Sequence, residues 1–346
     1  MAEIDKRRSI LVTGGSGFLG SYLLRQLLAE GYRHVQATRR ADSDLSLVGP
    51  QAGEVDWVEA DLLDIPALEE ALDGVDCVIH CAAVVSFDPR DRRKMWKINV
   101  DGTANLVNLC LERGVGKFLH VSSVAAIGRR KKLRQIDEDT KWERSKFNSQ
   151  YAISKHLSEM EVWRGSVEGL PVAVVNPSII LGSGDWSTGT PRFFQNVWKG
   201  LPFYPPGGSG FVDVRDVARF LVLLLESPVV GQRFVLNAEN WTYRELFAAI
   251  AESLDKQPPW VRVSPWLNEF VWRFEWLRSR LTGSTPIVTR ETARNAQRHW
   301  EYANERSKSV FPFAYTPVYD TIREVGRQYL EARQDGGGPR VLPLPE

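Results

Sequence analysis

Short apolar runs alternate with helical patterns along the first half of the chain. The apolar runs predict strands at 10–12, 35–37, 55–58, 75–80, 117–121 and 172–175. Apolar residues at helical spacing between them predict helices at 66–72, 93–113 and 151–168. Strand–helix–strand repetition requires right-handed crossovers, which give a parallel sheet with helices on both faces. We therefore expect a doubly wound α/β domain.

This regular alternation ends after Pro177. Loops rich in glycine and proline follow, and later a tryptophan-rich helical stretch, although sheet-and-helix patterning returns within 211–238. We expect a first domain of residues 1–176 that also receives about 211–238. A discontinuous, mostly helical substrate-binding region would comprise 177–210 and 239–330. Residues 331–346 have the composition of a disordered end.

Composition narrows the class of protein. The 346 residues are 43% hydrophobic and 25% charged, and their formal net charge is +1. A charge so close to zero argues against a nucleic-acid partner. No apolar run approaches the roughly 20 residues that span a bilayer, and the N-terminus lacks the apolar core of a secretion signal, so we expect a cytoplasmic protein. Cys77, Cys81 and Cys110 show neither an even number nor CxxC spacing, which argues against disulfides and a metal site.

A glycine-spaced turn joins the strand predicted at 10–12 to a further helix, which is predicted by Leu19, Leu23, Leu24, Leu27 and Leu28 at helical spacing. The segment TGGSGFLG contains Gly14, Gly17 and Gly20. Gly14 can take a positive φ, Gly17 lets the backbone approach a phosphate, and Gly20 lets the helix pack closely. The first N–H groups of the helix would then face an anion. This context favours a dinucleotide pyrophosphate site, which also includes Phe18 and Leu19, over an ordinary turn.

The end of the second strand bears on the choice of dinucleotide. Arg39 and Arg40 stand where an acidic residue would favour NAD, and guanidinium groups there would bind a 2′-phosphate. We therefore expect NADP(H), with NAD and a solvated pair of surface arginines as alternatives. Asp61, which precedes Leu62 at the same edge, could accept from the adenine amino group or cap a helix.

Candidate reacting groups lie in the segments YAISK and FLHVSSVAAIG. A helix places Tyr151 and Lys155 on one face, one turn apart. A nearby ammonium lowers a phenol pKa that is otherwise about 10, so Tyr151 could act as general acid and base. A serine at the carboxyl end of the strand 117–121 could bind a carbonyl oxygen as charge develops on it.

Taken together, these motifs resemble an extended short-chain dehydrogenase/reductase, from about residue 9 to about residue 330. The motifs are TGGSGFLG, DLLD, HCAA, INVDGT, VSSVAAIG, YAISK, NPSIILG and FVDVRDVA. The resemblance implies a Rossmann-type fold in which Tyr151 is the proton donor or acceptor and Lys155 tunes its pKa and binds the nicotinamide ribose. It also implies that Ser123 is the catalytic hydroxyl, that Ser122 is structural and that Asn99 positions the active-site helix.

The same resemblance implies further cofactor contacts. Ala82 and Ala83 would line the adenosine side, together with Cys81 of the same motif. The backbone from Pro177 to Ile180 would orient the nicotinamide carboxamide, and Val121 would lie beside the cofactor. Each assignment comes from the position of the residue within a motif of the family.

The segment before FVDVRDVA helps to choose a branch of this family. Sugar-nucleotide epimerases and dehydratases usually have an Arg-Asp pair there that helps to bind pyrophosphate, whereas this chain has Ser209 and Gly210. Arg215 lies beyond the segment and should face elsewhere. The sequence more closely resembles dihydroflavonol 4-reductases and 3β-hydroxysteroid dehydrogenases, whose substrates are apolar carbonyl compounds or alcohols.

The tryptophan-rich stretch is compatible with that branch. Trp260, Trp266, Trp272 and Trp276 would supply aromatic surface to a substrate cleft, although core packing or a membrane-surface helix would also explain them. We expect an NADP(H)-dependent oxidoreductase that acts on an apolar carbonyl compound. A homodimer is a possible assembly. The alternatives are an NAD-dependent nucleotide-sugar epimerase or dehydratase and a non-catalytic NADP(H)-sensing protein.

Overall fold

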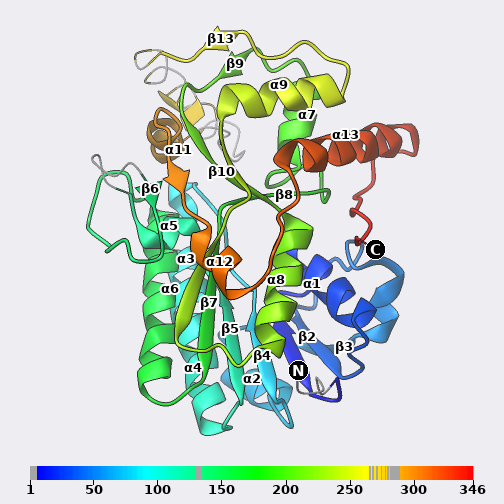
Figure 1. The fold of residues 1–346 in the computed structure, drawn as a ribbon, viewed down its shortest axis with the longest axis vertical. Coiled ribbons are helices and arrows are strands. Elements are labelled where there is room, and N and C mark those ends of the chain that lie inside the picture. Colours follow the sequence, from blue (N-terminus) through cyan, green and yellow to red (C-terminus); the bar gives the residue numbers. More distant parts are fainter. Residues whose placement is uncertain are drawn as a thin grey trace.

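A parallel sheet of seven strands forms the main body of the protein (Figure 1). The computed structural model describes residues 6–129, 135–264 and 289–345, together with residues 266, 269, 272–273, 275–276, 278 and 280. The strand order is β11-β7-β5-β4-β1-β2-β3, and every neighbouring pair is parallel. The strands are β1 (Ile10–Thr13), β2 (Val35–Arg39), β3 (Asp56–Glu59), β4 (Cys77–His80), β5 (Lys117–Val121), β7 (Val172–Pro177) and β11 (Gln232–Leu236).

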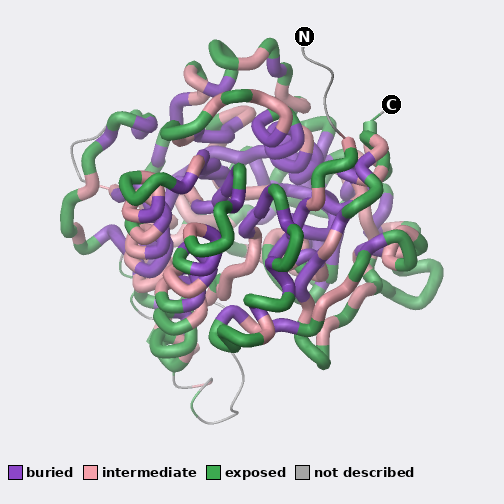
Figure 2. Tube along the Cα trace, turned by 90° about the horizontal axis from the view of Figure 1, so that it is seen from below, coloured by how far each residue is buried: buried purple, intermediate pink, exposed green. Residues whose placement is uncertain are grey.

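Helices cover both faces of this sheet, as the alternating pattern predicts. Ile10 and Val12 of β1 pack into one apolar core with α1 (Phe18–Ala29) and α8 (Val214–Glu226). Leu11, between them, packs into the other core, with α2 (Ile65–Ala71), α4 (Gly102–Glu112) and α6 (Gln150–Val167). Buried segments, purple in Figure 2, run through the interior between exposed turns. The doubly wound, Rossmann-type fold is confirmed.

The helix expected at 93–113 is interrupted. It consists of α3 (Arg92–Met95), the π-helical segment η3 (Trp96–Asp101) and α4. A Cβ on Gly102 would lie 2.8 Å from the Cβ of Leu62, so the glycine at the start of α4 allows this helix to lie close to the loop after β3.

A second region of helices and short sheets lies above the seven-stranded sheet in Figure 1. Its strands are β8 (Ile179–Leu181), β10 (Gly208–Asp213) and β12 (Glu239–Thr242), which pair in one sheet, β9 (Phe203–Tyr204) with β13 (Val261–Arg262), and β6 (Gln135–Ile136) with β14 (Glu301–Tyr302). Three short helical elements connect strands of the main sheet: η1 (Gly49–Glu54), η2 (Pro89–Asp91) and α5 (Val124–Ile127). The remaining helices are α7 (Arg192–Trp198), α9 (Tyr243–Ser253), α11 (Arg290–Asn295), α12 (Glu305–Val310) and α13 (Val318–Gln334). Among the described residues, no helix has the length and apolar character that crossing a membrane requires.

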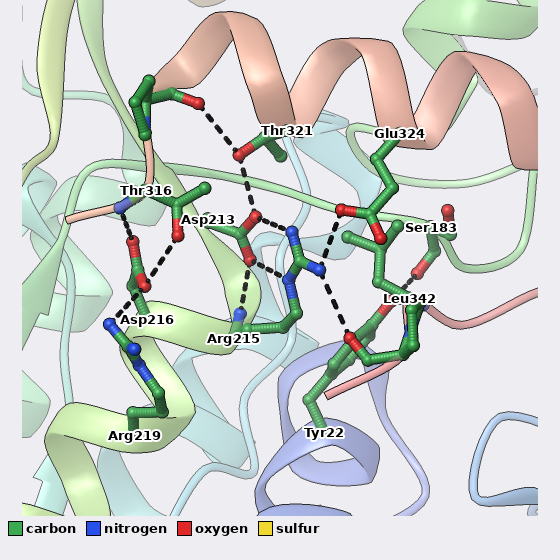
Figure 3. A network of polar contacts seen from close by, with 12 residues as sticks. Tyr22, Ser183, Asp213, Arg215, Asp216, Arg219, Thr316, Thr321, Glu324 and Leu342 are labelled. Carbon is green, nitrogen blue, oxygen red and sulfur yellow. Dashed lines mark hydrogen bonds and ion pairs between the residues drawn. The ribbon is translucent and has the colours of Figure 1, made fainter. Parts of the chain in front are cut away.

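The C-terminal end corrects an expectation. The composition of residues 331–346 predicts disorder, but α13 continues to Gln334, and Leu342 beyond it is fully buried. The Leu342 N–H donates to Tyr22 Oη at 2.7 Å, and Tyr22 in turn donates to the Ser183 carbonyl at 2.9 Å (Figure 3). Arg215 Nη1 donates to the carbonyl of Pro343 at 3.2 Å. Side chains from α1 and α8 thus satisfy backbone groups of a segment that has no regular structure of its own.

Candidate active site

The glycine-spaced turn is closely packed at the start of α1. Gly14 has a φ of +72°, and its carbonyl accepts from the Gly17 N–H at 3.0 Å. A Cβ on Gly20 would lie 2.1 Å from this carbonyl oxygen, and a Cβ on Gly14 would lie 2.7 Å from the Cα of Ala82. Gly17 is the N-cap of α1, and no side chain caps the helix there. The first N–H groups of α1, from Phe18 and Leu19 onward, are therefore placed to face an anion.

The two arginines after β2 differ in their surroundings. The Nε of Arg39 is buried and has no hydrogen-bond partner among the described residues. Arg40 is exposed, and its Nε lies 3.3 Å from Asp42 Oδ1. The orphaned donor of Arg39, next to a glycine cradle, fits a dinucleotide that carries a 2′-phosphate. Arg40 is already engaged with a carboxylate at the surface.

Asp61 does not cap a helix. Its Oδ1 accepts from the Leu63 N–H at 2.9 Å, while Asp64 is the N-cap of α2 and accepts from the Ala67 N–H at 3.2 Å. The helix-cap alternative for Asp61 is therefore wrong. The side chain of Leu62 is buried, so it packs against α4.

The loop after β4 lies against the end of β1. The Cys81 N–H donates to the Thr13 carbonyl at 3.1 Å, and the Ala82 N–H donates to Thr13 Oγ1 at 3.4 Å. Burial raises the pKa of the Cys81 thiol to about 12, and the charge of Lys155 opposes this shift. The segment that begins with Cys81, Ala82 and Ala83 thus leads from the glycine turn toward Lys155.

Ser123, Tyr151 and Lys155 meet at the carboxyl end of β5. Ser123 is the N-cap of α5 and accepts from the Ala125 N–H at 3.2 Å. Tyr151 is in the first turn of α6, and burial raises the pKa of its phenol, whereas a hydrogen bond with Ser123 and the charge of Arg129 lower it. Lys155 Nζ donates to the Val121 carbonyl at 2.7 Å. The sequence analysis did not single out Arg129.

Lys155 is almost completely buried. Burial lowers the pKa of its ammonium group to about 8, and the charge of Glu159 opposes this shift. A group whose pKa lies near neutrality can change its protonation state under ordinary conditions, which is common at functional sites.

Asn99 ties the loop after β4 to α6. Its Oδ1 accepts from the Val84 N–H at 2.7 Å, and its Nδ2 donates to the Val84 carbonyl at 2.9 Å and to Ser154 Oγ at 3.1 Å. Because Ser154 directly precedes Lys155, these bonds fix the helix that presents the reacting groups. The π-helical turn of η3 carries the Asn99 side chain.

Glu159 is a further buried group that the sequence analysis missed. Its Oε2 accepts from Ser122 Oγ at 2.6 Å and from Asn176 Nδ2 at 2.8 Å, and its Oε1 accepts from Arg233 Nη1 at 3.2 Å. The same Asn176 Nδ2 donates to the Ser123 carbonyl at 3.0 Å. Glu159 therefore holds the loop that bears Ser123. Its position four residues after Lys155, on the same helix face, was the available sequence signal.

An aromatic side chain from the loop after β4 packs against Tyr151. The ring of Phe87 lies edge-on to that of Tyr151, with centroids 5.7 Å apart. Pro177 ends β7 and Ile180 lies in β8, and their expected role in orienting the nicotinamide carboxamide stays a prediction. Arg215 is buried in α8, and its guanidinium pairs with Asp213 at 2.7 Å (Figure 3).

Three tryptophans of the stretch from 260 to 276 are exposed. Trp260, Trp266 and Trp276 are 66%, 67% and 52% exposed, which contradicts the core-packing alternative for these three. Trp272 is partly buried, and the central guanidinium carbon of Arg273 lies 4.9 Å from the centroid of its ring.

Comparisons with known proteins agree with this architecture. The "NAD dependent epimerase/dehydratase family" model matches residues 10–237. "Sterol demethylase protein B" of Methylococcus capsulatus is 32% identical over 263 residues, which are 75% of this chain and 78% of that protein. "Cinnamoyl-CoA reductase 1" of Oryza sativa is 26% identical over 99% of this chain and 95% of its own. The crystal structure of gox2253 is 33% identical, with a TM-score of 0.81 over 96% of this chain and 99% of its own. The chain therefore belongs to the NAD dependent epimerase/dehydratase family, in the branch of the extended short-chain dehydrogenases/reductases.

Proposed function

We propose that this oxidoreductase uses NADP(H) and transfers hydride between the nicotinamide and the carbonyl or alcohol group of an apolar, aromatic or polycyclic small molecule. One observation carries the proposal: Ser123 and Tyr151 lie together at the carboxyl end of β5, where the buried Lys155 Nζ donates to the Val121 carbonyl at 2.7 Å. The names of two relatives, a cinnamoyl-CoA reductase and a sterol demethylase protein, support an enzyme whose substrate carries an aromatic or polycyclic group.

Several residues of this chain would hold the cofactor. The turn with Gly14, Gly17 and Gly20 would bind the pyrophosphate, and Arg39 the 2′-phosphate. Lys155 would bind the nicotinamide ribose. When bound, the cofactor supplies the hydride donor or acceptor.

The protein's own chemistry concerns the substrate oxygen. The Tyr151 phenol donates its proton to this oxygen during reduction and takes it back during oxidation. Ser123 Oγ hydrogen-bonds the same oxygen while charge develops on it. Ser123 and the charge of Arg129 stabilise the phenolate, which burial alone would disfavour. Asn99 and Glu159 hold the two backbone segments from which these groups project.

The substrate class follows from the charges on the second region. Ser209 and Gly210 occupy the place of an Arg-Asp pair, and Arg215 is committed to ion pairs with Asp213 and, at 2.9 Å, with Glu324. A nucleotide diphosphate bound at Ser209 and Gly210 would lose its hydration without the arginine that such a pair supplies, which is costly. An apolar ring system gains roughly 25 cal/mol per Å² of buried surface instead.

The test measures turnover with a panel of aromatic and polycyclic aldehydes and ketones. The loss of NADPH absorbance reports each reaction. We expect reduction by the wild type, with NADPH preferred over NADH, and neither reaction nor inhibition by nucleotide sugars. Epimerisation of a UDP- or dTDP-sugar by the purified protein would overturn the proposal.

A further inference from the structure

We infer that Arg129 forms an anion-binding subsite beside the proposed reaction centre and selects a carbonyl substrate whose apolar ring system also carries a carboxylate. This inference rests on the proposed function and narrows its substrate class. It comes from the place of the Arg129 guanidinium in the fold, its neutral partners and the lack of an acidic partner among the described residues.

The backbone of Arg129 is tied to both catalytic segments. Arg129 follows α5, the short helix that Ser123 caps. Its N–H donates to Asn148 Oδ1 at 3.0 Å, and Asn148 directly precedes Ser149, the N-cap of α6. Tyr151 is in the first turn of that helix. Arg129 therefore starts from a fixed point between the residues proposed to hold the substrate oxygen.

The guanidinium of Arg129 is oriented by a neutral group. Its Nε and Nη2 donate to Tyr302 Oη at 3.0 and 2.8 Å, and Tyr302 in β14 is almost fully buried. Its central carbon lies 5.6 Å from the ring centroid of Trp300. A phenol and an indole ring orient a guanidinium without neutralising it, and its Nη1 remains available as a donor.

Arg129 lacks a counter-charge in the part of the chain that the structure describes. Arg129 takes part in no ion pair among the described residues. The five residues that follow it in the sequence, RKKLR, include no acid either. Arg129 is only partly exposed, and a partly buried charge without a partner is costly, so an anion supplied by a ligand would be favourable there.

The charge of Arg129 acts on the phenols of Tyr151 and Tyr243. It lowers the pKa of Tyr151, and it opposes the burial that raises the pKa of Tyr243 to about 12. Tyr243, the first residue of α9, is therefore a protonated donor at neutral pH and could share an anion with Arg129. The proposed substrate would therefore place its carboxylate on Arg129 and its carbonyl oxygen on Tyr151. Arg129 would act by selecting the substrate, and Tyr151 would still transfer the proton.

The test compares para-acetylbenzoate with its methyl ester, two ketones of similar shape that differ in charge, using the enzyme with saturating NADPH. A charged hydrogen bond contributes about 1.5–3 kcal/mol, so wild type should favour the acid about 10- to 100-fold in kcat/KM. Arg129→Gln should abolish this preference, which is the ratio of kcat/KM for the acid to kcat/KM for the ester within one enzyme and therefore does not depend on a change in absolute rate. Arg298→Gln, which removes another partly buried arginine stacked on an aromatic ring, should leave the preference intact. A preference that survives in Arg129→Gln, or a wild type that prefers the ester, would overturn the inference.

A binding measurement separates this inference from the proposed function. Calorimetric titration of the NADP⁺ complex with para-toluate and with para-toluamide needs no turnover. If wild type binds the carboxylate and Arg129→Gln does not, the subsite stands even where no ketone is reduced, and only the proposed function fails. If Arg129→Gln does not fold, Arg129→Lys keeps the charge and should retain part of the preference for the acid. Equal binding of the acid and the amide by wild type would contradict the subsite.

Discussion

The turn that starts α1 and the surroundings of Tyr151 are built in different ways. In the turn, the contacts join residues a few positions apart, such as the Gly17 N–H and the Gly14 carbonyl. Around Tyr151 they join distant segments, such as Arg129 and Tyr302 Oη or Arg233 and Glu159. A local motif can therefore identify the cofactor side, whereas the substrate side depends on how the second region folds onto the sheet.

The largest effect should come from Tyr151→Phe, which tests whether the distant contacts serve one phenol. It removes the proton-transfer group and leaves the ring, so turnover should fall by about 10²- to 10⁴-fold. NADPH affinity, measured by fluorescence titration, should stay within about twofold of wild type because the glycine turn is untouched. Retained turnover would assign the proton to another residue.

Gly20→Ala should disrupt the turn that starts α1, where the contacts are local. Its new Cβ would lie 2.1 Å from the Gly14 carbonyl oxygen, so the turn must shift. We expect a loss of about 3 kcal/mol in the free energy of unfolding, as for severe overpacking. NADPH binding should weaken as well, and urea unfolding with cofactor titration measures both. Gly53→Ala is the control, because a Cβ there meets nothing within 4 Å. Equal effects of the two changes would show that close packing at Gly20 is unimportant.

Arg39→Asp should separate the two nicotinamide cofactors. It replaces the unpaired guanidinium donor with a carboxylate, which has the same sign of charge as the 2′-phosphate. The Kd for NADPH should therefore rise about 10- to 100-fold. The Kd for NADH should change little. Arg40→Asp, at the exposed partner of Asp42, should have the smaller effect on NADPH. If Arg39→Asp weakens both cofactors equally, Arg39 is not a 2′-phosphate ligand.

Glu159→Gln should produce the smallest change in activity. It tests one of the contacts between distant segments around Tyr151. The amide still accepts a hydrogen bond but loses the charge that raises the pKa of Lys155 against burial. That pKa should fall below its present value of about 8, so the alkaline loss of kcat should begin at a lower pH. The acid limb should stay in place. Glu161→Gln on the same helix, which removes a surface partner of Arg164, should leave the profile unchanged. An unmoved alkaline limb in Glu159→Gln would mean that Glu159 does not influence Lys155.

Much of the fold follows from local patterns, for physical reasons. Strands such as β1 and β5 are continuous apolar runs because both faces of a parallel sheet are covered. The turn around Gly14 needs a positive φ and a close approach, which glycine alone supplies without strain. The cap of α2 was harder to place, because Asp61 and Asp64 are equally suitable residues, and the structure assigns the cap to Asp64.

The remaining features depend on contacts that no local pattern contains. Leu342 is buried because Tyr22, from the other end of the chain, accepts from its N–H. Arg129 looks like the first of a run of surface cations until Tyr302 and Trp300 enclose it. Glu159 resembles other charged residues of α6, yet Ser122 and Asn176 bury it. In each case the partner comes from a distant segment.

The most direct test of the proposed activity follows a deuterium label. NADPH deuterated at nicotinamide C4, prepared separately in each stereochemical form, is incubated with the enzyme and an aromatic ketone, and the products are weighed by mass spectrometry. A reductase predicts that one of the two forms transfers its deuterium to the carbon of the new alcohol in a one-to-one ratio with NADPH consumed, and that Tyr151→Phe abolishes this transfer. Deuterium that stays on the cofactor in both forms, together with conversion of a nucleotide sugar without net oxidation of cofactor, would contradict it.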